Sequence, residues 1–122
     1  MRILGIDPGY AIVGIGVVEY VGNKFKTLEY NAITTPSTMP TVERLKKIYT
    51  DMTSYIQKYK PDAIAIEELF FNSNQKTAIN VAQARGVLLV CGANANVPIF
   101  EYTPLQVKQA VTGYGRAEKA QI

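Results

Sequence analysis

The chain contains no histidine and only one cysteine, Cys91, among its 122 residues. Without histidine, nucleophile triads built on that residue and histidine-rich zinc sites are excluded, so carboxylates remain as the obvious metal ligands. A single cysteine excludes an internal disulfide. Because Cys91 lies in an apolar helical stretch, we expect it to pack in the core rather than to act as a reactive thiol.

Long apolar runs are missing as well. No stretch is apolar enough over the length needed to span a bilayer, and the N-terminal residues lead into an expected strand without a signal-peptide pattern. We therefore expect a cytoplasmic protein that does not bind membranes. With 48% hydrophobic and 19% charged residues, the composition suits one soluble domain with its own core. The net charge of +3 permits a polyanionic partner but does not require one.

Apolar periodicity predicts five strands, at 2–6, 12–20, 25–35, 63–66 and 97–102. Helices are expected at about 41–59, at 74–95 and from 103 to near 113, with the first turns of another at 117–122. Gly22 and Asn23 suit a two-residue hairpin turn with positive φ values. Three successive strands followed by alternating helices and strands predict an α/β fold. The first three strands would pair antiparallel, the later strands would pair parallel, and the first and fourth strands would be central.

Asp7 is the most informative residue, because it lies within the apolar run 3–9. An unpaired carboxylate buried in such a strand is costly, so its position predicts a cation beside it, most simply a divalent metal. The apolar run 63–66 leads in the same way into Glu67 and Glu68, of which alternation allows at most one to face a shared site. Asp7 and Glu67 would meet beyond the strand ends if their strands are neighbours, which suits metal-dependent phosphoryl transfer. The simpler alternative is a turn-capping Asp7 and a Glu67 at the sheet edge.

The helix expected at 74–95 carries apolar residues around its whole circumference rather than along one stripe. Such a helix is buried on more than one side. It is either a central core helix or part of an interface with a two-fold partner.

Four separated motifs carry a resemblance to a known family. They are ILGIDPG at 3–9, AIEELFF at 65–71, QARGV at 83–87, and EY at 101–102 followed by QVKQ at 106–109. In order and spacing they resemble the RuvC family of bacterial Holliday junction resolvases. The resemblance implies an RNase H-like fold over residues 1–122, with a mixed five-stranded sheet flanked by helices.

The same resemblance implies an endonuclease that nicks opposed strands of four-way DNA junctions in recombination and repair. It implies dependence on Mg²⁺ or Mn²⁺, with two ions in the complete protein. It also implies a homodimer and, as a further partner, a branch-migration helicase complex.

Matched motif by motif, the resemblance makes Asp7 and Glu67 the metal-binding catalytic acids. Phe70 matches an aromatic that relatives place against junction bases. Lys108 and Lys119 match basic residues near the scissile phosphate, so Lys119 joins the catalytic set. Other aromatic and basic residues are candidate DNA contacts, with ring packing or solvated surface charge as the simpler interpretation: Phe71, Lys76, Arg85 and Arg116.

The chain departs from the family pattern in two places. Relatives take further active-site acids from an Asp-rich helix near the C-terminus, and this chain stops at Ile122, before that segment. Val13 and Ile15 stand where relatives often carry Thr and Tyr. We therefore expect a domain that lacks the acidic C-terminal helix, either as a fragment or as a naturally short relative. Its metal affinity should be low, because the number of carboxylates sets affinity for hard cations.

Two other functions compete with nuclease activity. The missing acids favour a non-catalytic module that binds junction DNA. The Gly-Ile-Asp strand also occurs in actin-like and sugar-kinase-like ATPases, but the chain has no room for their second lobe and second phosphate loop.

Overall fold

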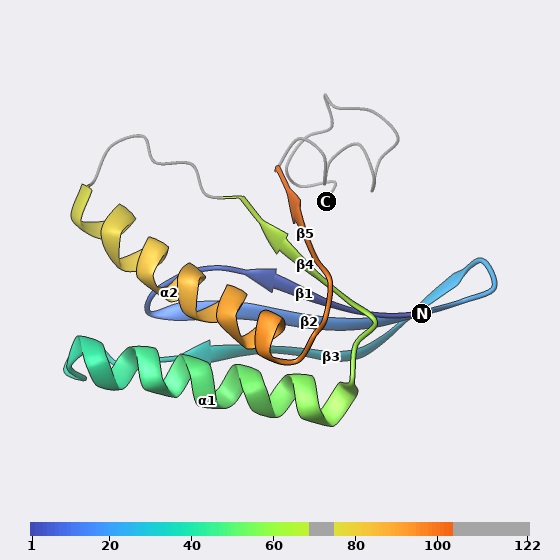
Figure 1. Ribbon diagram of the computed structural model, residues 1–122, viewed down its shortest axis with the longest axis horizontal. Helices are drawn as coiled ribbons and strands as arrows, with labels where there is room; N and C mark the ends of the chain where they lie inside the picture. Colours follow the sequence, from blue (N-terminus) through green and yellow to red (C-terminus); the bar gives the residue numbers. More distant parts are fainter. Residues whose placement is uncertain (69–74, 104–122) are drawn as a thin grey trace.

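The computed structural model describes residues 1–68 and 75–103 (Figure 1). In chain order its elements are β1 (Arg2–Asp7), β2 (Ile12–Val21), β3 (Lys24–Thr34), α1 (Thr41–Tyr59), β4 (Ala63–Glu67), α2 (Gln75–Asn94) and β5 (Ile99–Tyr102). All seven elements predicted for this range are present, with boundaries within two residues of the prediction. The helices expected beyond residue 103 lie outside the described residues.

The strands form one mixed sheet in the order β3-β2-β1-β4-β5. β1 pairs antiparallel with β2, and β2 pairs antiparallel with β3. β4 runs parallel to both β1 and β5. The predicted change from antiparallel to parallel pairing is therefore confirmed, and β1 occupies the centre of the sheet with β4 beside it.

Both helices cover the same face of the sheet and pack against each other (Figure 1). Every second side chain of a strand points to this face, as Leu4 and Ile6 of β1 do, and both are buried. α1 contributes one buried side chain per turn, at positions 44, 48, 52 and 56. Cys91 of α2 is 3% exposed within this core, and burial raises the pKa of its thiol, so the predicted packing role is confirmed.

The opposite face of the sheet is built from small residues at its centre. Gly5 of β1 lies between Gly16 of β2 and Ala65 of β4 in the strand register. Both described helices lie on the other face (Figure 1). Side chains or ligands can therefore approach the backbone of three neighbouring strands here.

Among the described residues of α2, the buried ones form a single stripe: Ala84, Leu88, Cys91 and Gly92. Its outer side remains exposed, with Ile79 at 59% and Val90 at 51%. Among the described residues, α1 and the sheet cover only one side of α2, so it is not a central core helix, and the alternative of an interface with a two-fold partner stays a prediction. Neither described helix is apolar enough over a sufficient length to cross a membrane.

Three residues with positive φ end elements or reverse the chain. In the β2–β3 hairpin Gly22 has φ 63°, and Asn23 does not share the positive φ expected for it. Lys60, with φ 47°, ends α1, and its N–H donates to the Ile56 carbonyl. Asn96, with φ 57°, turns the chain after α2, so β5 begins two residues later than predicted.

Candidate functional site

The carboxylates of Asp7 and Glu67 end two neighbouring parallel strands. The β1–β4 register pairs Ile6 with Ile66, so Asp7 and Glu67 form the next position on adjacent strands. Neighbouring strands lie about 4.8 Å apart. Because Ile6 and Ile66 point under the helices, alternation directs the following acids to the open face. The sequence-predicted meeting of the two strand ends is confirmed.

Asp7 is exposed, which corrects the expectation of a buried carboxylate. It is the last residue of β1 and points to the face that the described helices leave uncovered. Gly14 lies opposite it in the β1–β2 register, and a Cβ on Gly14 would stand 3.2 Å from the Asp7 Cβ. Glycine at this position therefore leaves the Asp7 side chain room that any other residue would restrict.

A cleft of about 910 Å³ lies on the open face of the sheet and reaches both acids. Small residues form much of its lining, and Tyr30 and Tyr102 are its aromatic members. Its small lining residues include Gly5, Gly14, Gly16 and Ala65, and the two acids in its lining are Asp7 and Glu67. A volume of this size is typical of a ligand site, and glycine allows the backbone of a ligand chain to come close.

Two carboxylates suit a hard divalent cation. Mg²⁺ usually keeps several waters and is held by one or two carboxylates together with substrate phosphates. Within residues 1–68 and 75–103, no group of three or more His, Cys, Asp and Glu side chains gathers into a metal site. Asp7 and Glu67 therefore fit a metal whose remaining ligands are water, phosphate or residues outside the described part.

Comparison with known proteins identifies the family of this chain. The family model described as crossover junction endodeoxyribonuclease RuvC matches residues 3–122. The chain belongs to the RuvC family. Over all 122 residues it is 64% identical to the RuvC protein of Alkaliphilus oremlandii and 59% identical to that of Halothermothrix orenii, and it spans 74% of each.

Solved structures of RuvC confirm the fold. Thermus thermophilus RuvC in complex with Holliday junction substrate matches the whole chain with a TM-score of 0.94 at 36% identity, and the chain covers 74% of it. The yeast mitochondrial Holliday junction resolvase, at 12% identity and a TM-score of 0.64, shares the fold alone. The mixed five-stranded sheet is thus an RNase H-like fold, as the sequence resemblance implied.

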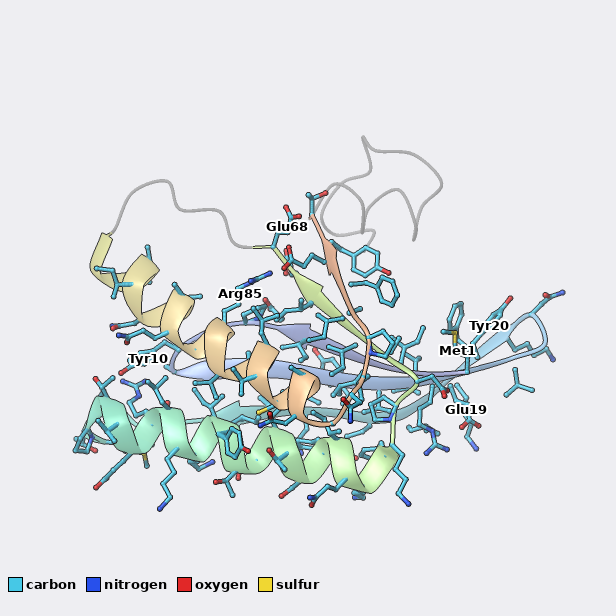
Figure 2. All side chains as sticks on the ribbon, in the orientation of Figure 1. Met1, Tyr10, Glu19, Tyr20, Glu68 and Arg85 are labelled. Atoms are coloured by element: carbon cyan, nitrogen blue, oxygen red, sulfur yellow. The ribbon has the colours of Figure 1, made fainter. Side chains whose placement is uncertain are left out.

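Among the other residues of the RuvC motifs, Arg85 belongs to α2, and its side chain reaches Glu101 of β5. Its Nη2 pairs with Glu101 Oε1 at 2.8 Å, its side chain is 16% exposed, and its Nε is buried without a hydrogen-bond partner among the described residues. Figure 2 shows Arg85 extending from α2 toward the end of the sheet where Glu68 lies. The sequence analysis did not foresee this ion pair, and a DNA contact from Arg85 stays a prediction.

Glu68 follows β4, and its N–H donates to the Tyr102 carbonyl at 2.7 Å. This bond extends the pairing of β4 with β5 one residue past Glu67. It holds the strand end that carries the second acid.

Six of the seven predicted DNA contacts have side chains outside the described residues. Lys76 belongs to the first turn of α2, but its side chain is not described. Five further candidates lie outside the described residues: Phe70, Phe71, Lys108, Arg116 and Lys119.

Arg44 was not among the residues predicted from the sequence, and it contacts the loop after Asp7 through Tyr10. Arg44 is 7% exposed, and its guanidinium lies over the ring of Tyr10. The available signal was spacing, since position 44 continues the four-residue repeat of Ile48, Met52 and Ile56. Charge obscured that signal, because arginine is rarely buried.

Proposed function

We propose that this chain is a metal-dependent endonuclease that nicks opposed strands of four-way DNA junctions, with Asp7 and Glu67 as metal ligands. The observation that carries the proposal is the position of both acids on adjacent parallel strand ends, at the cleft on the open face. Membership of the RuvC family and the similarity to a structure with Holliday junction substrate support the choice of DNA junctions.

A bound Mg²⁺ or Mn²⁺, with two ions in the complete protein, would supply an activated water and stabilise the leaving oxygen of the phosphodiester. The protein would contribute carboxylate oxygens in fixed positions. Asp7 and Glu67 carry these oxygens at the ends of two paired strands rather than on loops. Gly14 leaves room around Asp7, and the small residues of the cleft let a phosphodiester backbone approach.

We assign the remaining candidates to DNA contact as part of the same proposal. Phe70 and Phe71 would stack on or wedge between junction bases. Lys76, Arg85, Lys108, Arg116 and Lys119 would contact phosphates, with Lys119 close to the scissile one. The net charge of +3 is compatible with such binding.

The proposal extends to assembly and location. A four-way junction offers two opposed strands, so two copies related by two-fold symmetry would place one site on each. The exposed outer side of α2, with Ile79 and Val90, supports a homodimer through that face. A branch-migration helicase complex as partner and a cytoplasmic location complete the proposed setting, and residues 1–122 would be its resolvase domain.

The decisive experiment is substitution of Asp7. In a cleavage assay with Mg²⁺ and a synthetic four-way junction, Asp7→Asn should lower the cutting rate by roughly 10³-fold, because several kcal/mol of metal stabilisation are lost. Junction binding measured without metal should stay within about twofold, since the amide keeps the shape of the carboxylate. Cutting that persists in Asp7→Asn would remove Asp7 from the site.

The second candidate function is a non-catalytic module that binds junction DNA. It is favoured by the absence of a third acidic ligand near Asp7 and Glu67 within the described residues. It predicts junction binding that weakens steeply with salt and no strand cleavage at any Mg²⁺ or Mn²⁺ concentration. A cleavage assay on the 122-residue chain separates the two functions.

A further inference from the structure

Arg44 of α1 is a buried cation without a carboxylate partner among the described residues. It is 7% exposed. Its Nε donates to Thr35 Oγ1 at 2.9 Å, and its Nη2 donates to the Thr35 carbonyl at 3.2 Å. Burying an uncompensated charge is expensive, so the groups around it must recover part of that cost. Surface position or helix formation alone does not explain an arginine at this place.

The second group around Arg44 is the ring of Tyr10. The guanidinium carbon lies 3.8 Å from the ring centroid, which is a close cation–π contact. The Tyr10 hydroxyl donates to Thr41 Oγ1 at 2.9 Å, in the first turn of α1. The Tyr10 side chain is therefore held at its face by Arg44 and at its tip by Thr41.

Thr35 holds the backbone of the same loop. Its hydroxyl donates to the Tyr10 carbonyl at 3.0 Å while it accepts from Arg44. Its N–H donates to the Ala11 carbonyl at 2.9 Å. Arg44 thus reaches Tyr10 by two routes, directly through the ring and indirectly through the Thr35 hydroxyl.

Tyr10 is three residues from Asp7, within the four-residue connection from β1 to β2. The connection is tight: a Cβ on Gly9 would stand 2.0 Å from the Ile12 carbonyl oxygen. Only Pro8 and Gly9 separate Tyr10 from Asp7. Fixing Tyr10 would therefore restrict the backbone at the end of β1, from which the Asp7 carboxylate projects.

We propose that Arg44 is a positioning residue for Asp7, acting through Tyr10 and Thr35 on the loop that follows the carboxylate. This inference rests on the proposed role of Asp7 as a metal ligand. It assigns a function to a buried charge that the resemblance did not include. The expected size of its effect is that of groups which orient a metal ligand without touching the metal, about 10- to 100-fold in affinity.

The test is Mn²⁺ titration of the chain followed by electron paramagnetic resonance, which needs no cleavage. Arg44→Lys keeps the charge but cannot reproduce the planar contacts to Thr35 and Tyr10. It should raise the half-saturating Mn²⁺ concentration at least about tenfold. The matched control is Ile56→Val, a buried change three turns further along the same helix, which should leave Mn²⁺ binding within about twofold.

Thr35→Val provides a second variant if Arg44→Lys does not fold. It keeps the shape of Thr35 and removes the hydroxyl between Arg44 and Tyr10. Urea denaturation of each variant shows whether it is as stable as Ile56→Val, so that metal affinity is compared between proteins of similar stability. Mn²⁺ binding that changes no more in Arg44→Lys and Thr35→Val than in Ile56→Val would overturn the inference.

Asp7→Asn in the same titration separates this inference from the function it rests on. If Asp7→Asn weakens Mn²⁺ binding and the Arg44 and Thr35 variants do not, only the positioning role is wrong. If Asp7→Asn leaves Mn²⁺ binding unchanged, or the unmodified chain binds no Mn²⁺ even with junction DNA present to supply phosphate ligands, the metal site and the positioning role are both wrong.

Discussion

At the scale of single residues, the accessible position of Asp7 matters more for its proposed role than burial does. Asp7 is exposed at the end of a strand whose interior is buried, so it keeps its hydration and remains open to a cation and a substrate. A fully buried carboxylate would lose that hydration and be harder to ionise. The neighbouring strand favours the same accessibility through Gly14, which faces the Asp7 side chain.

Gly14→Ala tests this arrangement. The added Cβ would stand 3.2 Å from the Asp7 Cβ, which is tighter than ordinary contact, so Asp7 must move by a few tenths of an ångström. We expect Mn²⁺ affinity to fall by about tenfold, as for other changes that disturb the orientation of a metal ligand. Titration calorimetry measures it.

Gly16→Ala is the matched control, because it lies two residues further along β2 and its Cβ would meet no atom within 4 Å. Equal losses of metal affinity in both variants would show that the crowding of Asp7 is not the cause.

At the scale of elements, a side-chain hydrogen bond joins α1 to β3. The Tyr59 hydroxyl at the end of α1 donates to Glu29 Oε2 of β3 at 2.6 Å. This hydrogen bond is the main reason that the pKa of Glu29 lies below its usual value, with Asn31 as a second donor. The same bond raises the pKa of Tyr59, because ionised tyrosine could no longer donate it.

The lowered pKa of Glu29 makes the stability contribution of this bond depend on pH. Below the unfolded pKa the unfolded chain binds more protons than the folded one, so stability rises with pH in that window. The contribution is present above pH 4.5, the unshifted value, and is lost as pH falls through the folded pKa. Tyr59→Phe should therefore destabilise the protein at neutral pH and have a smaller effect near pH 3.

Urea denaturation at the two pH values measures the difference between Tyr59→Phe and the unmodified chain. In a Glu29→Gln background the same substitution should show no such change with pH, because the titrating group is gone. A pH-dependent effect that survives in that background would assign the dependence to another group.

At the scale of the whole molecule, the two faces of the sheet differ in what covers them. Helices α1 and α2 bury one face, while the open face carries the cleft and both acids. α2 in turn presents an apolar outer side, on which Ile79 and Val90 are eleven residues apart and so share one face of the helix. These two side chains are the exposed large apolar residues of α2 among those described, and they are the basis of the proposed homodimer.

Ile79→Glu tests the homodimer through this side of α2. If this side of α2 is the interface, a charge buried there loses its hydration, so we expect the dissociation constant to rise at least about 10-fold. Sedimentation velocity across a range of concentrations measures it. Val42→Glu is the control, because Val42 is 78% exposed on α1 and a glutamate in the first turn is compatible with the helix dipole. A sedimentation profile that Ile79→Glu leaves unchanged would exclude this side of α2 as the interface.

Local patterns in the sequence were sufficient for the seven described elements and for the choice of Asp7 as a candidate acid. Apolar residues recur every two positions in a strand and every 3.6 positions in a helix, because those side chains face the core. This spacing can be seen in the sequence without knowing which element packs against them. An acid at the end of an apolar strand is visible in the same way, which indicated Asp7 and the pair Glu67 and Glu68, and the resemblance to the RuvC family then favoured Glu67 over Glu68.

Only the tertiary structure decided the contacts between elements. It placed Asp7 on an exposed face, paired Arg85 with Glu101, and brought Arg44 to Tyr10 and Thr35. These partners are far apart in the chain and come together through strand order and helix packing, which no local pattern encodes. The identity of the candidate acids was therefore set by sequence, and what surrounds and orients Asp7 was set by the fold.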